Sequence, residues 1–546
     1  MGKTRLAVWG HNNIESRLHR AADGSVLALI GQPIGDFSWQ TVEDALHQAA
    51  KPEAFTLPWD GRLILLQISA NGQDWTMWND WLGSIPVFHA PLSKGRVASA
   101  LEPVTVAATN FSSNDIFVPA LLSLLIHGHY LSDWTLFKKM KTLPPDCAAK
   151  WDEQGFAYKQ LFTVAPSTDR WECGWDDLVD EAHHLARQAI GDVLQMQPNW
   201  TLPLSGGLDS RLIAAVGAEL GANMRAYTFG AAASRDALYA KQVANTLNLP
   251  WQRIGLNADY LSKYIPLWAD LFGSAMHFHG MHQMFFLDAL PDNPAAPILS
   301  GFLGEALAGY DVRFMSEFHA VEGKEQIIPD SYIHWKVAQV KPLMKIPIDN
   351  ALAALAETIK TGINSLPGAR FQQLRYLILW SRQRAFTYFS SALADYWRGV
   401  TTPFLNRAYA RFWHSLPRAV LDDRRLFADM FQRYYPALAA LPSTYWRPGI
   451  AVGYPLQPTG SYLLKRRLAA KLPALLLKGP LQEFSPRRAA TEQESFRAAG
   501  RQAVWPVYQV WDNLAKWVDL KQIEQTYQAA LNGSSVTPIR KLQSIQ

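Results

Sequence analysis

The chain has 546 residues, of which 49% are hydrophobic and 18% charged, and this composition excludes both a single small domain and a disordered polymer. Lys and Arg number 52 against 47 Asp and Glu, an excess too small for a protein that binds nucleic acid through a basic face. No stretch stays apolar over the roughly 18 residues that a membrane-spanning helix needs, so we expect no such helix.

The cysteine content and the N-terminus bear on the compartment. Cys147 and Cys173 are too few for a disulfide framework and do not have the spacing of zinc ligands. The first residues lack the apolar core of a secretory signal, and Leu6 stands where a myristoylation signal has Ser or Thr. We therefore expect a soluble, cytoplasmic protein.

Residues 1–160 contain short apolar runs separated by turn residues, including SVLALIG, GRLILLQIS, DWTMWND and GSIPVFHA. Runs of this length that alternate or stay apolar are typical of strands, so they predict a sheet-rich domain. The segment from Thr163 to Trp175 is polar, contains proline and shows no periodicity, as linkers do. These patterns predict two domains, residues 1–165 and residues 166–546.

Helical periods begin at residue 175 and pass into alternating strands and helices. A helix over 175–195 places Leu178, Ala182, Leu185 and Ile190 close to one face. The strand run WTLPL, a glycine turn and a helix ended by Gly221 follow, and then the strand MRAYTFG and the helix SRDALYAKQVANTLNL. This alternation predicts a doubly wound parallel α/β sheet. Further helices are predicted over 371–397, 403–445 and the partly basic tail 463–546.

The strongest functional signal is the heptapeptide Leu204, Ser205, Gly206, Gly207, Leu208, Asp209 and Ser210, between a predicted strand and a predicted helix. Two glycines allow a tight turn that presents backbone N–H groups to an anion, and the helix N-terminus adds partial positive charge. Asp209 places a carboxylate where a magnesium ion bridging phosphates would bind. The loop lacks the Lys of the Walker motif, which disfavours a P-loop kinase or GTPase. A plain strand-turn-helix would explain the glycines but not the combination of two Ser and one Asp.

The loop SGGLDS resembles the pyrophosphate loop of ATP-pyrophosphatase synthetases, and most closely that of the asparagine synthetase B group, with its relatives the β-lactam and carbapenam synthetases and the lasso-peptide cyclases. Four further stretches resemble motifs of this group in the same order: NDWLGSIPVF at 79–88, WTLF with LPP at 134–145, SGFLGEALAG at 300–309 and PFLN at 403–406. The resemblance covers about residues 60–450. It implies an N-terminal glutaminase-like α/β domain of stacked sheets, followed by a larger synthetase domain.

The same resemblance implies that ATP and Mg²⁺ bind at this loop. The nucleotide contacts that it implies come from the loop together with Phe229, Ser300 and Gly301. Glu305 falls on the Asp that resembles the second magnesium ligand, beside Asp209, and its carboxylate still offers hard oxygens.

Three departures from the group change the expected chemistry. Glutamine-hydrolysing members begin with a nucleophilic Cys, whereas here Gly2 follows Met1, so we expect no ammonia from glutamine. Phe302 stands where the asparagine enzymes have Glu and the β-lactam enzyme Tyr, and Phe cannot transfer a proton. Gly399 and Thr401 replace the Glu and Arg that precede the PFLD motif, which makes aspartate a less favoured substrate.

Two further features leave alternatives open. YWRPGI at 445–450 resembles the R-P-K-x-G-I stretch of the group and puts Arg447 on its charge-stabilising Lys; the alternative is a surface Arg, with Arg424 and Arg425 as the next candidates. The segment that contains His277, His279 and His282 has a spacing that zinc accepts, with Asp270 or Asp288 nearby. Lining of the substrate pocket or ordinary packing is the favoured interpretation of these histidines.

The sequence therefore predicts an ATP-dependent amide-bond-forming synthetase in which a carboxylate is adenylated and an amine then displaces AMP. The favoured substrate is a precursor peptide closed into a macrolactam, as by lasso-peptide cyclases, with a leader peptidase and a peptide-recognition protein as expected partners. Amidation of a small carboxylate and a non-catalytic scaffold remain alternatives, and a His-dependent metallohydrolase is a more distant one.

Overall fold

The computed structural model describes most of the chain before residue 445 and little after it. The described residues are 4–8, 16–49, 54–230, 232, 234–257, 260–276, 280–291, 296–310, 337–385, 387–444, 464, 467–468, 515–523 and 525. Within these ranges no helix is both long enough and apolar enough to cross a membrane. Arg447, His277 and His279 lie outside the described residues, as does most of the predicted helical tail.

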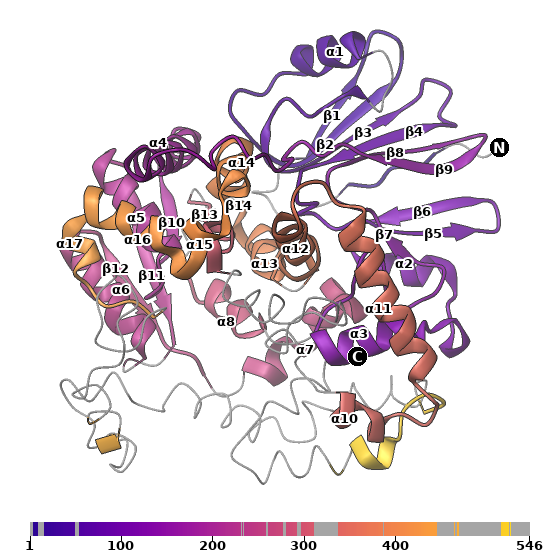
Figure 1. Ribbon diagram of the computed structural model, residues 1–546. Helices are drawn as coiled ribbons and strands as arrows, with labels where there is room; N and C mark the ends of the chain where they lie inside the picture. The colour runs from indigo at the N-terminus through magenta and orange to yellow at the C-terminus, as the bar shows by residue number, and fades with distance from the viewer. Residues whose placement is uncertain are drawn as a thin grey trace.

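The described part of the N-terminal region forms two antiparallel sheets (Figure 1). The larger has the order β1 (Ser16–Arg20), β2 (Val26–Ile34), β3 (Asp60–Ile68), β4 (Trp75–Asn79), β8 (Cys147–Asp152) and β9 (Gly155–Gln160). The smaller has the order β6 (Gly95–Ser99), β5 (Phe88–Leu92) and β7 (Lys141–Thr142). Among the described residues of this region, the sheets are accompanied by the helices α1 (Trp39–Gln48), α2 (Glu102–Thr109) and α3 (Val118–His127). The prediction of a sheet-rich N-terminal region is confirmed.

The continuous apolar run in β3 is explained by burial of both faces of this strand. Leu63 and Leu65 face one core cluster, which also contains Val42 of α1, whereas Ile64 and Leu66 face another on the opposite side of the sheet. Successive side chains of a strand point to opposite faces, so a strand buried on both sides must be apolar at every position. The larger sheet is therefore the middle layer of this region.

A third sheet, formed by the described residues after the N-terminal region, is parallel and has five strands, as the alternation of strands and helices predicts. Its order is β12 (Trp251–Ile254), β11 (Met224–Phe229), β10 (Trp200–Pro203), β13 (Ile298–Leu299) and β14 (Val400–Thr401). The connecting helices include α5 (Asp209–Glu219) and α6 (Arg235–Thr246), and α4 (Trp175–Leu194) packs on α5. The buried face of α4 contains Leu178, Ala182 and Ile190, while Leu185 is partly buried.

The strand order reverses at β10. From β10 the chain moves outward to β11 and then β12, and it returns to the other side of β10 to form β13. In open α/β sheets, the carboxyl ends of the two strands on either side of such a reversal leave a crevice in which ligands bind. The ends of β10 and β13 are therefore the expected location of the site.

Helices form most of the remaining described structure. After β12 come α7 (Tyr260–Phe272), a 3₁₀ turn (Gly273–Ala275), α8 (His282–Asp288), a π-helical turn (Ala306–Tyr310), α10 (Val337–Val340), α11 (Asp349–Asn364), α12 (Arg370–Ile378), a π-helical turn (Leu379–Gln383), α13 (Phe389–Arg398), a 3₁₀ turn (Pro403–Leu405), α14 (Arg407–Ser415), α15 (Arg418–Leu421), a 3₁₀ turn (Asp422–Arg424), α16 (Arg425–Tyr434) and α17 (Pro436–Ala439). The described residues of the predicted helical regions 371–397 and 403–445 are largely helical, as predicted, but each region is divided into several short helices. Pro417 directly precedes α15 and Pro436 begins α17, at positions where the missing N–H of proline costs no hydrogen bond within the helix.

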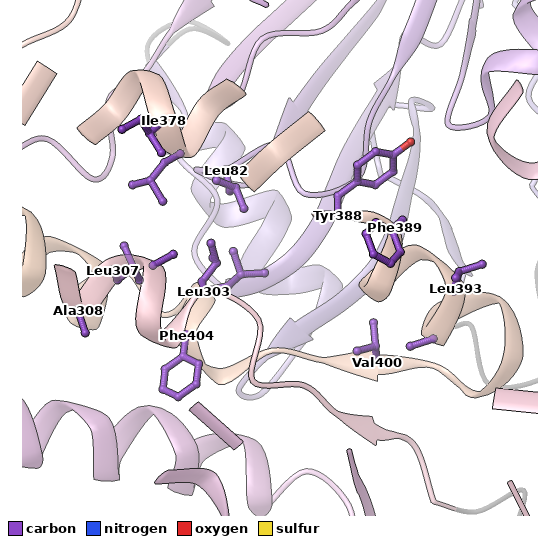
Figure 2. Close-up of a cluster of buried hydrophobic side chains, with 14 of the residues drawn as sticks. Leu82, Leu303, Leu307, Ala308, Ile378, Tyr388, Phe389, Leu393, Val400 and Phe404 are labelled. Atoms are coloured by element: carbon purple, nitrogen blue, oxygen red, sulfur yellow. The ribbon is translucent and has the colours of Figure 1, made fainter. Parts of the chain in front are cut away.

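The two regions share one hydrophobic core. Figure 2 shows Leu82, from the loop after β4, near Leu303, Leu307 and Phe404 of the parallel-sheet region. The indole N–H of Trp81 donates a hydrogen bond of 2.8 Å to the carbonyl of Leu405. Apolar packing is thus continuous across the predicted boundary at residue 165, so the N-terminal region packs directly against the parallel-sheet region.

A buried carboxyl also joins the two regions. Glu102 of α2 is 2% exposed and accepts hydrogen bonds from the backbone N–H (3.1 Å) and the hydroxyl (2.5 Å) of Ser274. Tyr130 donates its hydroxyl to the carbonyl of Ser274, at 2.8 Å. Burial raises the pKa of Glu102 from 4.5 to about 7, and the bonds from Ser274 offset only part of that rise.

This pKa predicts a pH-dependent stability that Glu102→Gln removes. Because the pKa of Glu102 is higher in the folded protein, the protonated carboxyl stabilises the fold fully below pH 4.5, and this stability is lost as the pH rises to about 7. The group alone should lower the free energy of unfolding by about 3 kcal/mol over that interval. We expect Glu102→Gln to unfold like the wild type near pH 4.5 and to be more stable near pH 8, in denaturant titrations at both values. Equal stability of the two proteins near pH 8 would contradict the assignment.

Candidate active site

The predicted nucleotide loop lies at the reversal of the strand order. Residues 204–208 connect the carboxyl end of β10 to the first residue of α5, Asp209, and Ser300 and Gly301 follow β13 on the neighbouring strand. The sequence prediction of a strand, a glycine turn and a helix is therefore confirmed at this position. Both predicted groups of nucleotide contacts emerge at the same edge of the sheet.

Successive backbone N–H groups of the loop are held by side-chain oxygens. The N–H of Gly206 donates to Asp236 Oδ1 (3.2 Å), and that of Gly207 donates to Ser205 Oγ (3.1 Å). The N–H of Leu208 donates to Glu305 Oε1 (2.9 Å). Consecutive donors at a helix N-terminus form an anion-binding cradle.

Two glycines are required by close packing at the loop. A Cβ on Gly206 would lie 2.6 Å from Thr444 Cγ2, and a Cβ on Gly304 would lie 2.9 Å from Asp209 Oδ1 and 2.8 Å from Phe404 Cε2. Each distance is too short for a side chain. The segment after β13 therefore touches the carboxylate of Asp209 directly, which brings the SGFLGE stretch and the SGGLDS loop into one site.

Asp209 is a buried carboxylate with spare acceptor capacity. Its Oδ1 atom has no hydrogen-bond partner among the described residues. Burial and the negative charge of Glu305 raise its pKa well above the ordinary value, although the backbone of Glu305 and the charge of Arg424 oppose the shift. Two neighbouring carboxylates repel each other when both are ionised, here the buried Asp209 and the partly buried Glu305, and a cation between them relieves that repulsion.

Glu305 links the loop to a buried arginine. While Oε1 accepts the N–H of Leu208, Oε2 lies 2.7 Å from Nη1 of Arg424, whose side chain is 0% exposed. Arg424 also has a positive φ of 55°, a conformation that residues other than glycine rarely adopt. The next residue, Arg425, is exposed. Of the two alternatives to Arg447, only Arg424 therefore lies at the carboxylates.

The donor set fits magnesium better than zinc. No group of three or more His, Cys, Asp or Glu side chains that could hold a metal occurs in the described part of the chain. Magnesium is usually bound by one or two carboxylates together with substrate phosphates and water, and the oxygens of Asp209 and Glu305 correspond to that pattern. A carboxylate has about four lone-pair sites, so Glu305 can keep its two protein partners and still accept a cation.

Phe229 and His282 lie together at the carboxyl end of β11. The two ring centroids are 5.1 Å apart, and Phe286 of α8 lies at the same distance from Phe229. Asp288, a possible zinc ligand in the sequence, is bound to Lys263 Nζ (2.7 Å) and to the hydroxyl of Tyr264 (2.6 Å). The structure thus places His282 beside a predicted nucleotide contact.

Phe302 is half-buried and packs against the main core. Its backbone N–H donates to the hydroxyl of Ser300 at 3.2 Å, and the following Leu303 has a positive φ of 78°. A benzyl side chain at this position contributes shape and no proton transfer.

The comparison with known families assigns the region of the chain that contains this site. Residues 181–422 match the family described as asparagine synthase. Residues 181–422 are an asparagine synthase domain. The match includes the nucleotide loop, Glu305 and the PFLN motif, so ATP-dependent formation of a carbon–nitrogen bond from a carboxylate is the activity of this domain. No curated protein matches the chain.

Sequence reasoning missed several residues at the site of the asparagine synthase domain. Asp236, the second residue of α6, accepts the N–H of Gly206, and Arg211 and Thr444 contact the same loop. The position of Asp236 two residues after the N-cap Ser234 was a signal, because acidic residues are typical of a first helical turn. No local pattern marks Arg211 or Thr444.

Proposed function

We propose that the chain adenylates a carboxylate of a precursor peptide with ATP and joins it to an amine of the same peptide, forming a macrolactam as lasso-peptide cyclases do. The observation that carries the adenylation step is the juxtaposition of the loop N–H groups with the carboxylates of Asp209 and Glu305 at the strand reversal. The departures of the sequence from the asparagine enzymes favour the peptide substrate.

The proposed reaction consists of two displacements, the first releasing pyrophosphate and the second releasing AMP. A carboxylate oxygen of the substrate attacks the α-phosphorus of ATP and pyrophosphate leaves. The amine nitrogen then attacks the acyl carbon, AMP leaves with the bonding electrons, and the nitrogen loses a proton. When bound, a magnesium ion held by Asp209 and Glu305 supplies charge neutralisation at the phosphate oxygens. The contribution of the chain is to bind, orient and stabilise charge, without a covalent nucleophile.

Arginines supply the positive charge in this proposal. Arg424 fixes Glu305 through their ion pair, so it acts through Glu305 as a positioning residue. Arg447 is proposed to stabilise the pyrophosphate leaving group. The backbone N–H of Thr444 donates to the carbonyl of Gly206 in the loop. Arg447 lies three residues after Thr444, and three residues of extended chain reach at most about 11 Å.

The amine is proposed to come from the peptide rather than from glutamine. The chain contains two cysteines. Cys147 is buried, donates its thiol to the carbonyl of Pro144, and has its pKa raised to about 12 by burial, which suppresses the nucleophilic thiolate. Cys173 is exposed and lies in the segment before α4, which follows the strands of the N-terminal region in the chain.

We expect no glutamate from glutamine at any ATP concentration, because neither thiol is placed to attack a side-chain amide. The measurement is glutamate release by a homogeneous preparation with ATP and magnesium present. Cys147→Ser and Cys173→Ser serve as matched controls, since any glutaminase activity that survives both replacements comes from a contaminant. Activity that disappears with one of them would overturn this part of the proposal.

Two assays separate the proposed function from its alternatives. Pyrophosphate and AMP release with a candidate precursor peptide, together with loss of one water from the peptide mass, supports the macrolactam synthetase. Release with aspartate and ammonium, and none with peptides, supports amidation of a small carboxylate. A folded protein that binds Mg·ATP and releases no pyrophosphate with either substrate class would be the non-catalytic scaffold. The neighbouring genes offer an independent test, since a short precursor peptide and a leader peptidase are the expected partners.

A further inference from the structure

A fully buried arginine lies behind the nucleotide loop. Arg211, in the first turn of α5, is 0% exposed, and its guanidinium donates to the carbonyls of Leu438 (3.0 Å), Leu441 (3.2 Å) and Pro442 (2.6 Å). A fourth, longer contact of 3.4 Å reaches the carbonyl of Gly206. Burying a guanidinium is unfavourable unless several acceptors replace its water, and here all four are backbone carbonyls.

The same segment is fastened to the loop a second time. The backbone N–H of Thr444 donates to the carbonyl of Gly206 at 2.9 Å. The methyl group of Thr444 lies 2.6 Å from the position that a Cβ on Gly206 would occupy, so the loop and the 438–444 segment are in close contact. The carbonyl of Gly206 therefore points toward the 438–444 segment and has two donors there, Arg211 and Thr444.

The direction of this carbonyl also fixes a donor of the cradle. The carbonyl of Gly206 and the N–H of Gly207 belong to one peptide unit, and in a trans peptide they point in opposite directions. A peptide between two glycines rotates easily because neither residue has a Cβ. Without a restraint it could turn its carbonyl toward the phosphates, where an oxygen repels an anion.

We propose that Arg211 is a positioning residue for nucleotide binding: together with the N–H of Thr444 it holds the Gly206 carbonyl away from the cradle, and so it keeps the Gly207 N–H, which donates to Ser205 Oγ in this structure, on the cradle side of the loop. This role rests on the proposed assignment of the loop to the phosphates of ATP. Arg211 acts directly through its contact with Gly206 and indirectly by holding the chain that carries Thr444.

The test compares variants that keep or remove each donor. Arg211→Lys keeps the positive charge but loses the fork that reaches several carbonyls. Thr444→Pro removes the backbone N–H, and Thr444→Ala, its matched control, keeps it. Arg398→Lys is the control for burial, because Arg398 is another buried arginine that donates to backbone carbonyls, those of Leu290 and Pro291.

The readouts are the Kd of Mg·ATP from calorimetry and the steady-state constants of pyrophosphate release. We expect Arg211→Lys and Thr444→Pro each to raise Kd and KM for ATP about tenfold, with kcat at saturating ATP within about threefold, because binding in ground and transition states weakens equally. The double variant should be little weaker than either single one, since both act on one carbonyl. Arg398→Lys should bind Mg·ATP like the wild type, and Thr444→Ala, which keeps the backbone N–H, should weaken binding far less than Thr444→Pro.

Three results would overturn the role of Arg211. They are wild-type Kd in folded Arg211→Lys, full multiplication of the two single effects in the double variant, and a loss of kcat at unchanged KM, which indicates general destabilisation. Arg211→Met separates the effect of charge from that of orientation. If Arg211→Met binds Mg·ATP weakly and Arg211→Lys binds it normally, only the positive charge matters. A wild type that fails to bind Mg·ATP would instead refute the assignment of the loop, and the role of Arg211 with it.

Discussion

Asp209→Asn is expected to abolish pyrophosphate release and to leave the protein folded. The replacement removes a charged oxygen from the site at which a cation and the phosphates are proposed to meet. Loss of a metal ligand at a reacting phosphate should reduce turnover by about 10³-fold or more, since metal stabilisation contributes several kcal/mol. The measurement is pyrophosphate release by wild type and variant at saturating Mg·ATP.

The stability of this variant provides the control. Asp209 has a raised pKa because it is buried beside Glu305, so the ionised side chain is unfavourable in the fold. Asn is isosteric and neutral, and we expect its thermal unfolding temperature at neutral pH to equal or exceed that of the wild type. A variant that is both inactive and less stable would indicate that Asp209 supports the fold. Near wild-type pyrophosphate release would show that the assignment of the loop is wrong.

Arg447→Ala is expected to lower turnover about 10²–10³-fold, or about 2.7–4 kcal/mol of barrier, by analogy with removal of a preorganised donor. Its charge is proposed to act on the pyrophosphate leaving group, where negative charge increases in the transition state. Binding of ATP should change far less, because the interaction is stronger in the transition state than in the ground state. Arg447→Lys should recover part of the rate, since a point charge suffices and the relatives have Lys at this position.

The control for Arg447 uses circular dichroism to establish that each variant is folded. Turnover of Arg447→Ala within about threefold of the wild type, far short of the loss for a preorganised donor, would make Arg447 a surface residue. The charge would then have to come from Arg424, because Arg425 is exposed and Arg424 already contacts Glu305. This outcome differs from the one expected for Arg211→Lys, which changes the affinity for ATP and not the turnover.

Local patterns in the sequence predicted the strands, turns and helices that residues close together in the chain determine. The run WTLP forms β10, the glycine turn follows it, and α5 begins at Asp209, because a strand, a turn and a helix start each have a signal within a few residues. The helix α4 and the pair of β11 and α6 were predicted for the same reason. β13 and β14 have two residues each, which is too short for any periodicity, so only their pairing in the sheet identifies them.

By itself, the sequence indicated a phosphate-binding loop, since two glycines, two serines and one aspartate lie within seven consecutive residues. The class of chemistry followed from the resemblance of this loop and of four further stretches to ATP-pyrophosphatase synthetases. Only the tertiary structure decided which residues serve that loop. Glu305 accepts a loop N–H from 97 positions away, and Arg211 reaches Pro442 across 231. Such contacts arise from the strand order and from the core shared with Leu82, and periodicity along the chain carries no information about pairs so far apart.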